Sequence, residues 1–121
     1  MTAGAGFYDD LRPLPPLPST AQLAALPVRK FLFERRQNMW AINGQFVDVN
    51  VPRAVIPMGA MEIWELTSID DGWDHPIHIH FEEGRILSKS IDGRNVTVPI
   101  HERGRKDVFV IEGFATTRVL M

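Results

Sequence analysis

From Val28 onward, hydrophobic and polar residues alternate in short runs, which is the pattern of β-strands with one buried face. Turn-forming pairs separate these runs, and Asn43-Gly44, which favours a two-residue hairpin turn, and Asp92-Gly93 are the clearest of them. The runs that predict strands are 28–35, 39–47, 53–69, 76–82, 84–90, 95–100, 108–114 and 115–121, of which 76–82 and 84–90 are two strands or one bent strand. Seven or eight short strands predict an all-β fold, either a β-sandwich or a Greek-key barrel.

The first 27 residues lack this alternation and contain five of the nine prolines. Residues 8–27, "YDDLRPLPPLPSTAQLAALP", are typical of an extended or polyproline II connector. Ser19 or Thr20 is suited to cap a short helical turn over "AQLAAL", which Pro27 ends. Because leucines recur along this segment, we expect it to lie along another surface, the alternative being a disordered tail. The sequence therefore predicts a connector, 1–27, followed by a β-domain, 28–121.

The composition restricts the kinds of function that the chain can have. Its 121 residues are enough for one domain, and the formal net charge of −2, with both signs interspersed, gives no reason to expect a nucleic-acid or membrane partner. No run of about eighteen apolar residues predicts a membrane span. The chain has no cysteine, which excludes disulfides and any zinc or copper site with a thiolate ligand from this chain alone.

Three of the four histidines lie within six positions, in the stretch "WDHPIHIHFEEG" (73–84). In a strand, alternate side chains share one face, so His78 and His80 are predicted to point the same way, about 6.5–7 Å apart. The residues predicted to face the apolar side are Ile77, Ile79 and Phe81. This arrangement predicts a metal-binding face backed by the core.

The third histidine of the stretch, His75, precedes Pro76, which favours an extended backbone at His75 and removes a donor at the start of the strand. Its imidazole need not share the face of the other two, so the spacing favours two neighbouring metal sites over one three-histidine site. Imidazole suits copper, zinc, iron and nickel alike, and the alternative is three histidines without metal. The fourth histidine, His101, is expected to be a solvated loop residue.

Five carboxylates flank the histidines: Asp70, Asp71, Asp74, Glu82 and Glu83. A carboxylate that accepts the second N–H of a ligating imidazole would fix its tautomer, and Asp74 is the nearest candidate in sequence. The alternative is that these residues are acidic because such residues favour turns.

The stretch "MEIWELTSIDDGWDHPIHIHFEEGRIL" (61–87) resembles the start of the C-terminal cupredoxin domain of multicopper oxidases, especially the laccase-like, spore-coat and bilirubin-oxidase-like branch. Sequences of that branch typically contain E-I-W-E-hydrophobic, then a short turn with Gly-Trp, and then H-P-hydrophobic-H-hydrophobic-H. Three further pieces resemble the family in the same order: the linker "DDLRPLPPLP" (9–18), the first hairpin "MWAINGQFV" (39–47) and the Lys-Asp strand "GRKDVFVI" (104–111). The similarity covers nearly all of residues 8–111.

The resemblance implies a cupredoxin-like fold and copper as the cofactor. It implies that His75 is a ligand of type 1 copper, that His78 binds type 2 copper, and that His80 binds one of the paired type 3 coppers. In such an enzyme a phenol or a metal ion reduces type 1 copper, and dioxygen is reduced to water at the cluster. This division agrees with the separation of His75 from the other two histidines.

The chain also departs from the family. The family's domain continues with an H-C-H segment, whereas this sequence ends at Met121 before such a segment, and further cluster histidines come from an N-terminal domain. We therefore expect incomplete copper sites, partners in the remaining domains or segments of the oxidase, and no oxidase activity from the chain alone. We also expect the fold to lack its last strands, which would leave an open sheet edge through which the chain could self-associate.

The sequence is also compatible with two kinds of protein other than a multicopper oxidase. One is a small metal-binding β-barrel of cupin type, which would bind iron or manganese through His78, His80 and His101. Cupins usually place a glutamate four or five positions after the second histidine, whereas Glu82 and Glu83 follow His80 by two and three positions. The other is a degenerate domain that serves only as an interaction module and binds no metal.

Overall fold

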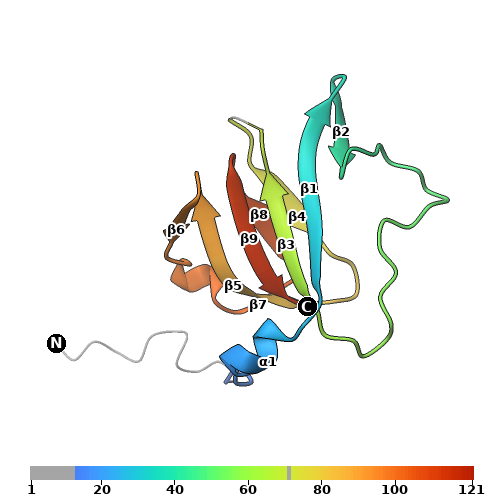
Figure 1. The fold of residues 1–121 in the computed structure, drawn as a ribbon. Helices are drawn as coiled ribbons and strands as arrows, with labels where there is room; N and C mark the ends of the chain where they lie inside the picture. Colours follow the sequence, from blue (N-terminus) through green and yellow to red (C-terminus); the bar gives the residue numbers. More distant parts are fainter. Residues whose placement is uncertain (1–12, 71) are drawn as a thin grey trace.

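The computed structural model describes residues 13–70 and 72–121, so that residues 1–12 of the predicted connector and Asp71 lie outside the described residues. One sheet has the strand order β2-β1-β3-β9-β5-β6, with β7 paired to β5, and β4 and β8 form a second sheet (Figure 1). The elements are α1 (Thr20–Ala24), β1 (Val28–Arg36), β2 (Met39–Ile42), β3 (Ile63–Ser68), β4 (His75–His78), β5 (Gly84–Ile91), β6 (Arg94–Val96), the 3₁₀ helix η2 (Ile100–Glu102), β7 (Arg105–Lys106), β8 (Val108–Ile111) and β9 (Ala115–Leu120). The all-β prediction is confirmed, and β4 and β5 are two strands in different sheets.

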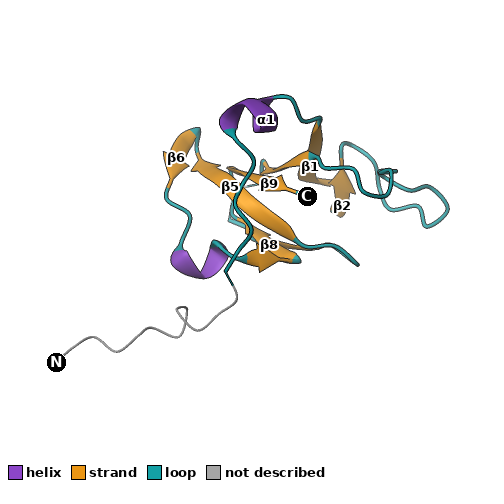
Figure 2. Ribbon diagram, turned by 90° about the horizontal axis from the view of Figure 1, so that it is seen from below, coloured by secondary structure: helices purple, strands orange, loops and turns teal. Residues whose placement is uncertain are grey.

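The two sheets form two layers with the core between them. Figure 1 shows β4 and β8 behind the large sheet, and Figure 2 shows β8 on the side of that sheet opposite to α1. The buried residues of the core come from both layers: Phe31, Phe33, Leu66, Phe109, Ile111, Ala115 and Val119. Burial of this apolar surface is the main contribution to the stability of the fold, and β4 forms one wall of the core through Ile77 and Ile79.

The hairpin between β1 and β2 turns at Gln37-Asn38. The predicted two-residue turn at Asn43-Gly44 is also confirmed, because Ile42 and Gln45 exchange backbone hydrogen bonds of 2.9 and 3.0 Å across it and both turn residues have positive φ angles. Both Gln37 and Asn38 have positive φ angles, 50° and 63°, as the tight turns between right-twisted strands require. Asn43 also ties the end of β2 to β1, because its side chain accepts the N–H of Leu32 at 2.8 Å and donates to the carbonyl of Lys30 at 3.0 Å. Gln37-Asn38 lacks the glycine that makes such turns recognisable in a sequence.

A β-bulge in β5 turns a lysine into the interior. The pairing of β5 with β9 shifts register between Ile86 and Ser88, and such a shift exchanges the inward and outward residues beyond it. Lys89 therefore faces inward, where its side chain is 2% exposed and its Nζ contacts carboxylate oxygens of Glu102 at 3.0 Å and Glu112 at 2.8 Å. These contacts join β5 to η2 and to the end of β8.

The charges of Lys89, Glu102 and Glu112, called here the Lys89 cluster, stabilise one another. Burial alone would lower the pKa of Lys89, but its hydrogen bonds to Glu112 and Glu102 outweigh burial and raise that pKa above its ordinary value. Burial alone would raise the pKa of Glu102, but the hydrogen bond and charge of Lys89, helped by Lys106, hold it below its ordinary value. Both groups are therefore charged over a wide pH range.

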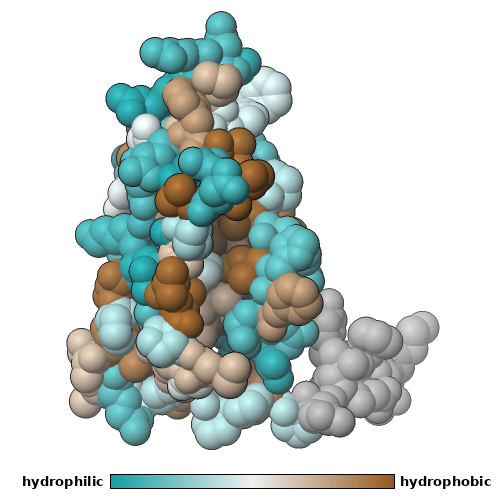
Figure 3. Space-filling view, turned by 90° about the vertical axis from the view of Figure 1, so that its right-hand side faces the viewer, coloured by the Kyte–Doolittle hydropathy of each residue, from teal (hydrophilic) through white to brown (hydrophobic). Residues whose placement is uncertain are grey.

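The connection between β2 and β3, residues 43–62, extends away from the sheet (Figure 1) and exposes many of its hydrophobic side chains. The most exposed are Val47, Val49, Val55 and Met58. Figure 3 shows this side of the molecule, where exposed hydrophobic residues lie between hydrophilic ones. The connection ends at Glu62, whose buried carboxylate accepts two hydrogen bonds from Arg29, both 2.8 Å, and one from Trp64. The hydrogen bonds from Arg29 lower the pKa of Glu62.

The described part of the predicted connector contains α1, which confirms the expected helical turn. Ser19 caps it, since its hydroxyl accepts the N–H of Gln22 and the Gln22 side chain accepts the N–H of Ser19. The segment before the helix contacts the large sheet, because Arg85 donates to the carbonyl of Pro15 at 2.6 Å. Among the described residues, no helix has the length and hydrophobicity that crossing a membrane would require.

Candidate metal centre

The histidine-rich strand β4 begins at His75 and ends at His78, with His80 two residues beyond its end. It pairs antiparallel with β8, and the hydrogen bond from the Ile79 N–H to the Asp107 carbonyl, at 2.8 Å, extends this pairing past the strand end. This extension keeps the backbone from His75 to Ile79 in a regular alternation. As a result, the imidazoles of the stretch fall into two groups.

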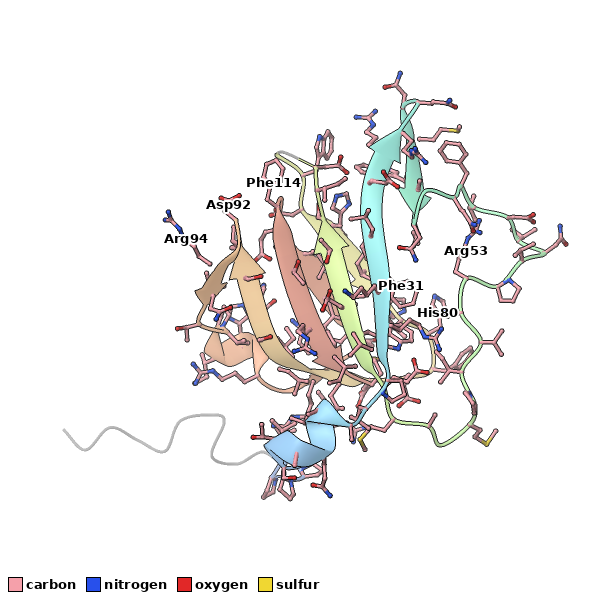
Figure 4. The ribbon with its side chains drawn as sticks, in the orientation of Figure 1. Phe31, Arg53, His80, Asp92, Arg94 and Phe114 are labelled. Carbon is pink, nitrogen blue, oxygen red and sulfur yellow. The ribbon has the colours of Figure 1, made fainter. Side chains whose placement is uncertain are left out.

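His78 and His80 form the first group. Their ring centroids lie 4.7 Å apart, and both side chains are exposed, as the prediction of a shared face requires. Figure 4 shows His80 on the side of the molecule where the β2–β3 connection lies. Ile77 and Ile79 pack against the core as predicted, but the prediction that Phe81 faces the apolar side was wrong. Phe81 is fully exposed and has a φ angle of 66°, because the chain leaves the strand in a tight turn there.

His75 stands apart from this pair and is 9% exposed. Its ring is stacked with that of Phe33 at a centroid distance of 6.5 Å and lies perpendicular to that of Trp40 at 4.7 Å, and Trp40 in turn contacts Trp73 at 6.2 Å. The aromatic neighbours fix the plane of the imidazole. His75 also lines a hollow with a largely apolar wall, to which Phe33 and Trp40 contribute.

The carboxylates that lie near the imidazoles are not Asp74, the residue that the sequence indicated. Oδ2 of Asp70 lies 3.8 Å from Nε2 of His75, and Oδ2 of Asp107 lies 3.6 Å from Nδ1 of His78. Asp74 is exposed, and among the described residues no ion pair or hydrogen bond of its carboxylate is found. Sequence reasoning missed Asp107 because its proximity to His78 depends on the pairing of β4 with β8, which local spacing does not reveal.

Other side chains with possible donor atoms line hollows beside the histidine pair. His80 and Glu82 line a second hollow together with Met58, Met61 and Met121, which come from the β2–β3 connection and from the residue after β9. His101 is exposed in η2, as expected for a solvated histidine. Within the described residues, no group of three or more His, Cys, Asp or Glu side chains lies close enough to hold one metal ion.

Comparison with protein families and curated proteins gives a consistent result. Residues 21–121 match the family described as "Multicopper oxidase". A bilirubin oxidase of Albifimbria verrucaria is 43% identical over 82 residues, which are 66% of this chain and 14% of that protein. A laccase of Haloferax volcanii is 37% identical over 82 residues, again 66% of this chain and 14% of that protein. The chain thus spans about 14% of the length of these relatives.

Solved structures share the fold. A laccase from Pediococcus acidilactici superposes with a TM-score of 0.76 at 22% identity, over 90% of this chain and 23% of that chain. The laccase-like multicopper oxidase CueO from Ochrobactrum sp., which has oxidase activity towards lignin model compounds and lignosulfonate, has a TM-score of 0.67 at 30% identity, over 88% of this chain and 25% of that chain. The predicted cupredoxin-like fold is confirmed, and the cupin-type alternative is not favoured.

Proposed function

The chain belongs to the multicopper oxidase family, and we propose that residues 28–121 form the copper-binding portion of such an oxidase, with residues 1–27 as the connector to another domain. The observation that carries this proposal is the arrangement of β4 within the matched region. His78 and His80 lie side by side on it, and His75 is held separately. Copper is the cofactor that membership of the family implies.

The proposed ligands follow this division. His75 is a ligand of type 1 copper, His78 of type 2 copper, and His80 of one of the type 3 coppers. The 4.7 Å between the rings of His78 and His80 supports their assignment to neighbouring ions, and the aromatic surroundings of His75 support its assignment to another site.

The side chains of this chain would supply some, but not all, of the ligands that these copper sites need. Neutral imidazole suits copper, and since Nε2 of His75 is buried beside Oδ2 of Asp70, Nδ1 is the nitrogen that would bind an ion. A type 1 site also needs a thiolate, and the chain has no cysteine. Other segments or domains of the oxidase are therefore the proposed partners that supply the missing ligands.

Within the whole oxidase, bound copper would accept electrons one at a time from a phenol or a metal ion and supply them to dioxygen, which becomes water. The residues of this chain would hold two of the ions side by side and keep water from much of His75. Phenolic substrates agree with the activity of the Ochrobactrum relative towards lignin model compounds. We expect the chain alone to lack oxidase activity, because it contributes three imidazoles and no thiolate.

Copper binding tests the assignment directly. Titration of the purified chain with Cu(II), followed by calorimetry and electron paramagnetic resonance, is expected to show binding with nitrogen ligands. His80→Ala should weaken binding at least tenfold, about 1.4 kcal/mol, because one of two adjacent imidazoles is lost. His101→Ala is the matched control, since His101 is also exposed but lies outside the pair. Equal affinities of the two variants would reject the assignment, and no binding of Cu(II) by the unaltered chain would favour a metal-free interaction module.

Activity tests the proposal about the isolated chain. The copper-loaded chain is expected to oxidise a phenolic dye no faster than free Cu(II) does at the same concentration. Dye turnover above that level by the pure 121-residue chain would contradict the proposal that other segments must complete the sites.

The strand β4 also offers a surface for association. Since Ile79 donates to β8, the alternating residues Pro76 and His78 direct their backbone groups to the other edge of β4, which among the described residues has no partner strand. We propose that the chain self-associates through this edge when the rest of the oxidase is absent. Sedimentation velocity should show dimers or larger species whose fraction rises with concentration, and a monomer at all concentrations would contradict this.

A further inference from the structure

Two buried polar atoms face each other at the start of β4 without a hydrogen bond. They are Nε2 of His75 and Oδ2 of Asp70, 3.8 Å apart, and neither has a hydrogen-bond partner among the described residues. Buried polar atoms are nearly always hydrogen-bonded, because water no longer compensates them. A pair of such atoms, one a potential donor and one an acceptor, therefore needs an explanation.

The fold holds the two groups from separate elements. Asp70 follows β3, where its N–H faces the Ser68 hydroxyl at 3.4 Å and its carbonyl packs against Gly113. A Cβ at position 113 would lie 2.8 Å from this carbonyl, so only glycine allows the approach. His75 is held by the ring of Phe33 and the edge of Trp40. The alignment of Asp70 with His75 is thus built by the packing of three segments and does not arise from one flexible loop.

We propose that Asp70 is the positioning residue of His75: its carboxylate accepts the Nε2–H of the imidazole and thereby leaves Nδ1 unprotonated and free to bind a metal ion. A ligating histidine usually donates its second N–H to a carboxylate or carbonyl, which selects the tautomer and the ring orientation. The contact has to shorten by about 1 Å to reach hydrogen-bond distance. The role of Nδ1 as a copper ligand rests on the proposed function, but the tautomer is a property of this chain without metal.

Among the described residues, Asp107 and Asp74 do not compete for this role. Asp107 lies beside His78, at 3.6 Å from its Nδ1. Asp74 is nearest to His75 in sequence, yet its side chain is exposed. Asp70 and Asp74 therefore provide a matched pair of residues, one that faces the imidazole and one that does not.

The experiment is nuclear magnetic resonance of the ¹⁵N-labelled, metal-free chain at about pH 8, a pH that favours neutral imidazole. Two-bond ¹H–¹⁵N spectra report the tautomer, and the signals of His75 are those that His75→Gln removes. The expected result is a single Nε2–H tautomer with an N–H proton that exchanges slowly with water. In Asp70→Leu, this proton should exchange about tenfold faster or more, because a hydrogen bond to a charged acceptor is lost. Asp74→Leu should leave both observations unchanged.

A proton on Nδ1 in the unaltered chain, or equal exchange rates in Asp70→Leu and the unaltered chain, would overturn the proposal. If Asp70→Leu does not fold, the tautomer of His75 in Asp70→Asn provides the test. An amide donates to an unprotonated nitrogen as readily as it accepts from a protonated one, so a mixture of tautomers is expected. A single unchanged tautomer in folded Asp70→Asn would overturn the proposal. Because all of these spectra are recorded without metal, a failure of copper binding would reject the proposed function and leave this result standing.

Discussion

Two of the regions that bury polar side chains differ in whether the facing groups are within hydrogen-bond distance. Around Lys89, the ammonium contacts carboxylates of Glu102 and Glu112 at 3.0 and 2.8 Å. At the start of β4, Nε2 of His75 and Oδ2 of Asp70 lie 3.8 Å apart without partners. A fold is stabilised by the first arrangement, whereas the second leaves a free-energy cost that a hydrogen bond or a ligand would remove. Buried polar groups therefore support structure in one region and indicate a candidate site in the other.

The largest effect is expected where the partnered cluster is broken. Lys89→Met keeps the length of the side chain but leaves the carboxylate of Glu102 buried without its main counter-charge. Removal of one partner of a buried ion pair destabilises a protein by about 3–5 kcal/mol. Urea denaturation followed by circular dichroism should show a loss of this size in the free energy of unfolding.

The matched control is an exposed lysine in another strand of the same sheet. The side chain of Lys30 is 75% exposed and lies 3.6 Å from Glu65, so Lys30→Met should change the free energy of unfolding by about 0–1 kcal/mol. If Lys89→Met were no more destabilising than Lys30→Met, the cluster would not support the fold and the contrast with His75 would fail.

A smaller effect, with a defined pH dependence, is expected at Glu62. The hydrogen bonds from Arg29 hold the pKa of Glu62 below its value of about 4.3 in an unfolded chain. A carboxyl with a lowered folded pKa contributes stability that is present above pH 4.3 and is lost as the pH falls through the folded pKa. Glu62→Gln should therefore lower stability at pH 7 and make stability depend less on pH below about 4.3. The loss should be smaller than for Lys89→Met, because the Arg29 side chain is 32% exposed.

Thermal unfolding between about pH 3 and pH 7 measures this dependence. Glu82→Gln is the control, because Glu82 is exposed and faces no cation in an ion pair of the described residues. Identical acid profiles of Glu62→Gln and the unaltered chain would show that the Arg29–Glu62 contact does not form in solution.

The parts of the fold that follow local periodicity could be predicted from the sequence. Alternation placed the strands and the shared face of His78 and His80, and the capping pattern at Ser19 located α1. Lys89 could not be placed, because a bulge between Ile86 and Ser88 decides which residues of β5 face inward. Local spacing does not contain that shift.

The surroundings of the histidines were predicted less well for a similar reason. Asp74 is adjacent to His75 in sequence, but an adjacent residue in an extended backbone points away from it. Asp70 reaches the imidazole because the chain folds back between β3 and β4, and Asp107 reaches His78 because β4 pairs with β8. Contacts between elements depend on tertiary packing, so the sequence located the histidines of the candidate site more clearly than the carboxylates that lie beside them.

The smallest effect is expected in the turn that follows the histidine pair. Phe81 has a φ angle of 66°, a left-handed conformation that costs free energy for a residue with a side chain, and its ring is fully exposed and lacks packing that would compensate. Phe81→Gly should therefore stabilise the chain by about 0.5–1 kcal/mol and raise Tm by a few degrees in a thermal scan. Phe114 is the control, because it has a φ angle of 55° but is 47% exposed, so Phe114→Gly relieves the same strain while losing packing contacts. A destabilised Phe81→Gly variant would mean that Phe81 contacts another surface in solution. Such a contact would cover the side of the molecule where His78 and His80 are exposed. The histidine region would then not be an open site to compare with the buried Lys89 cluster.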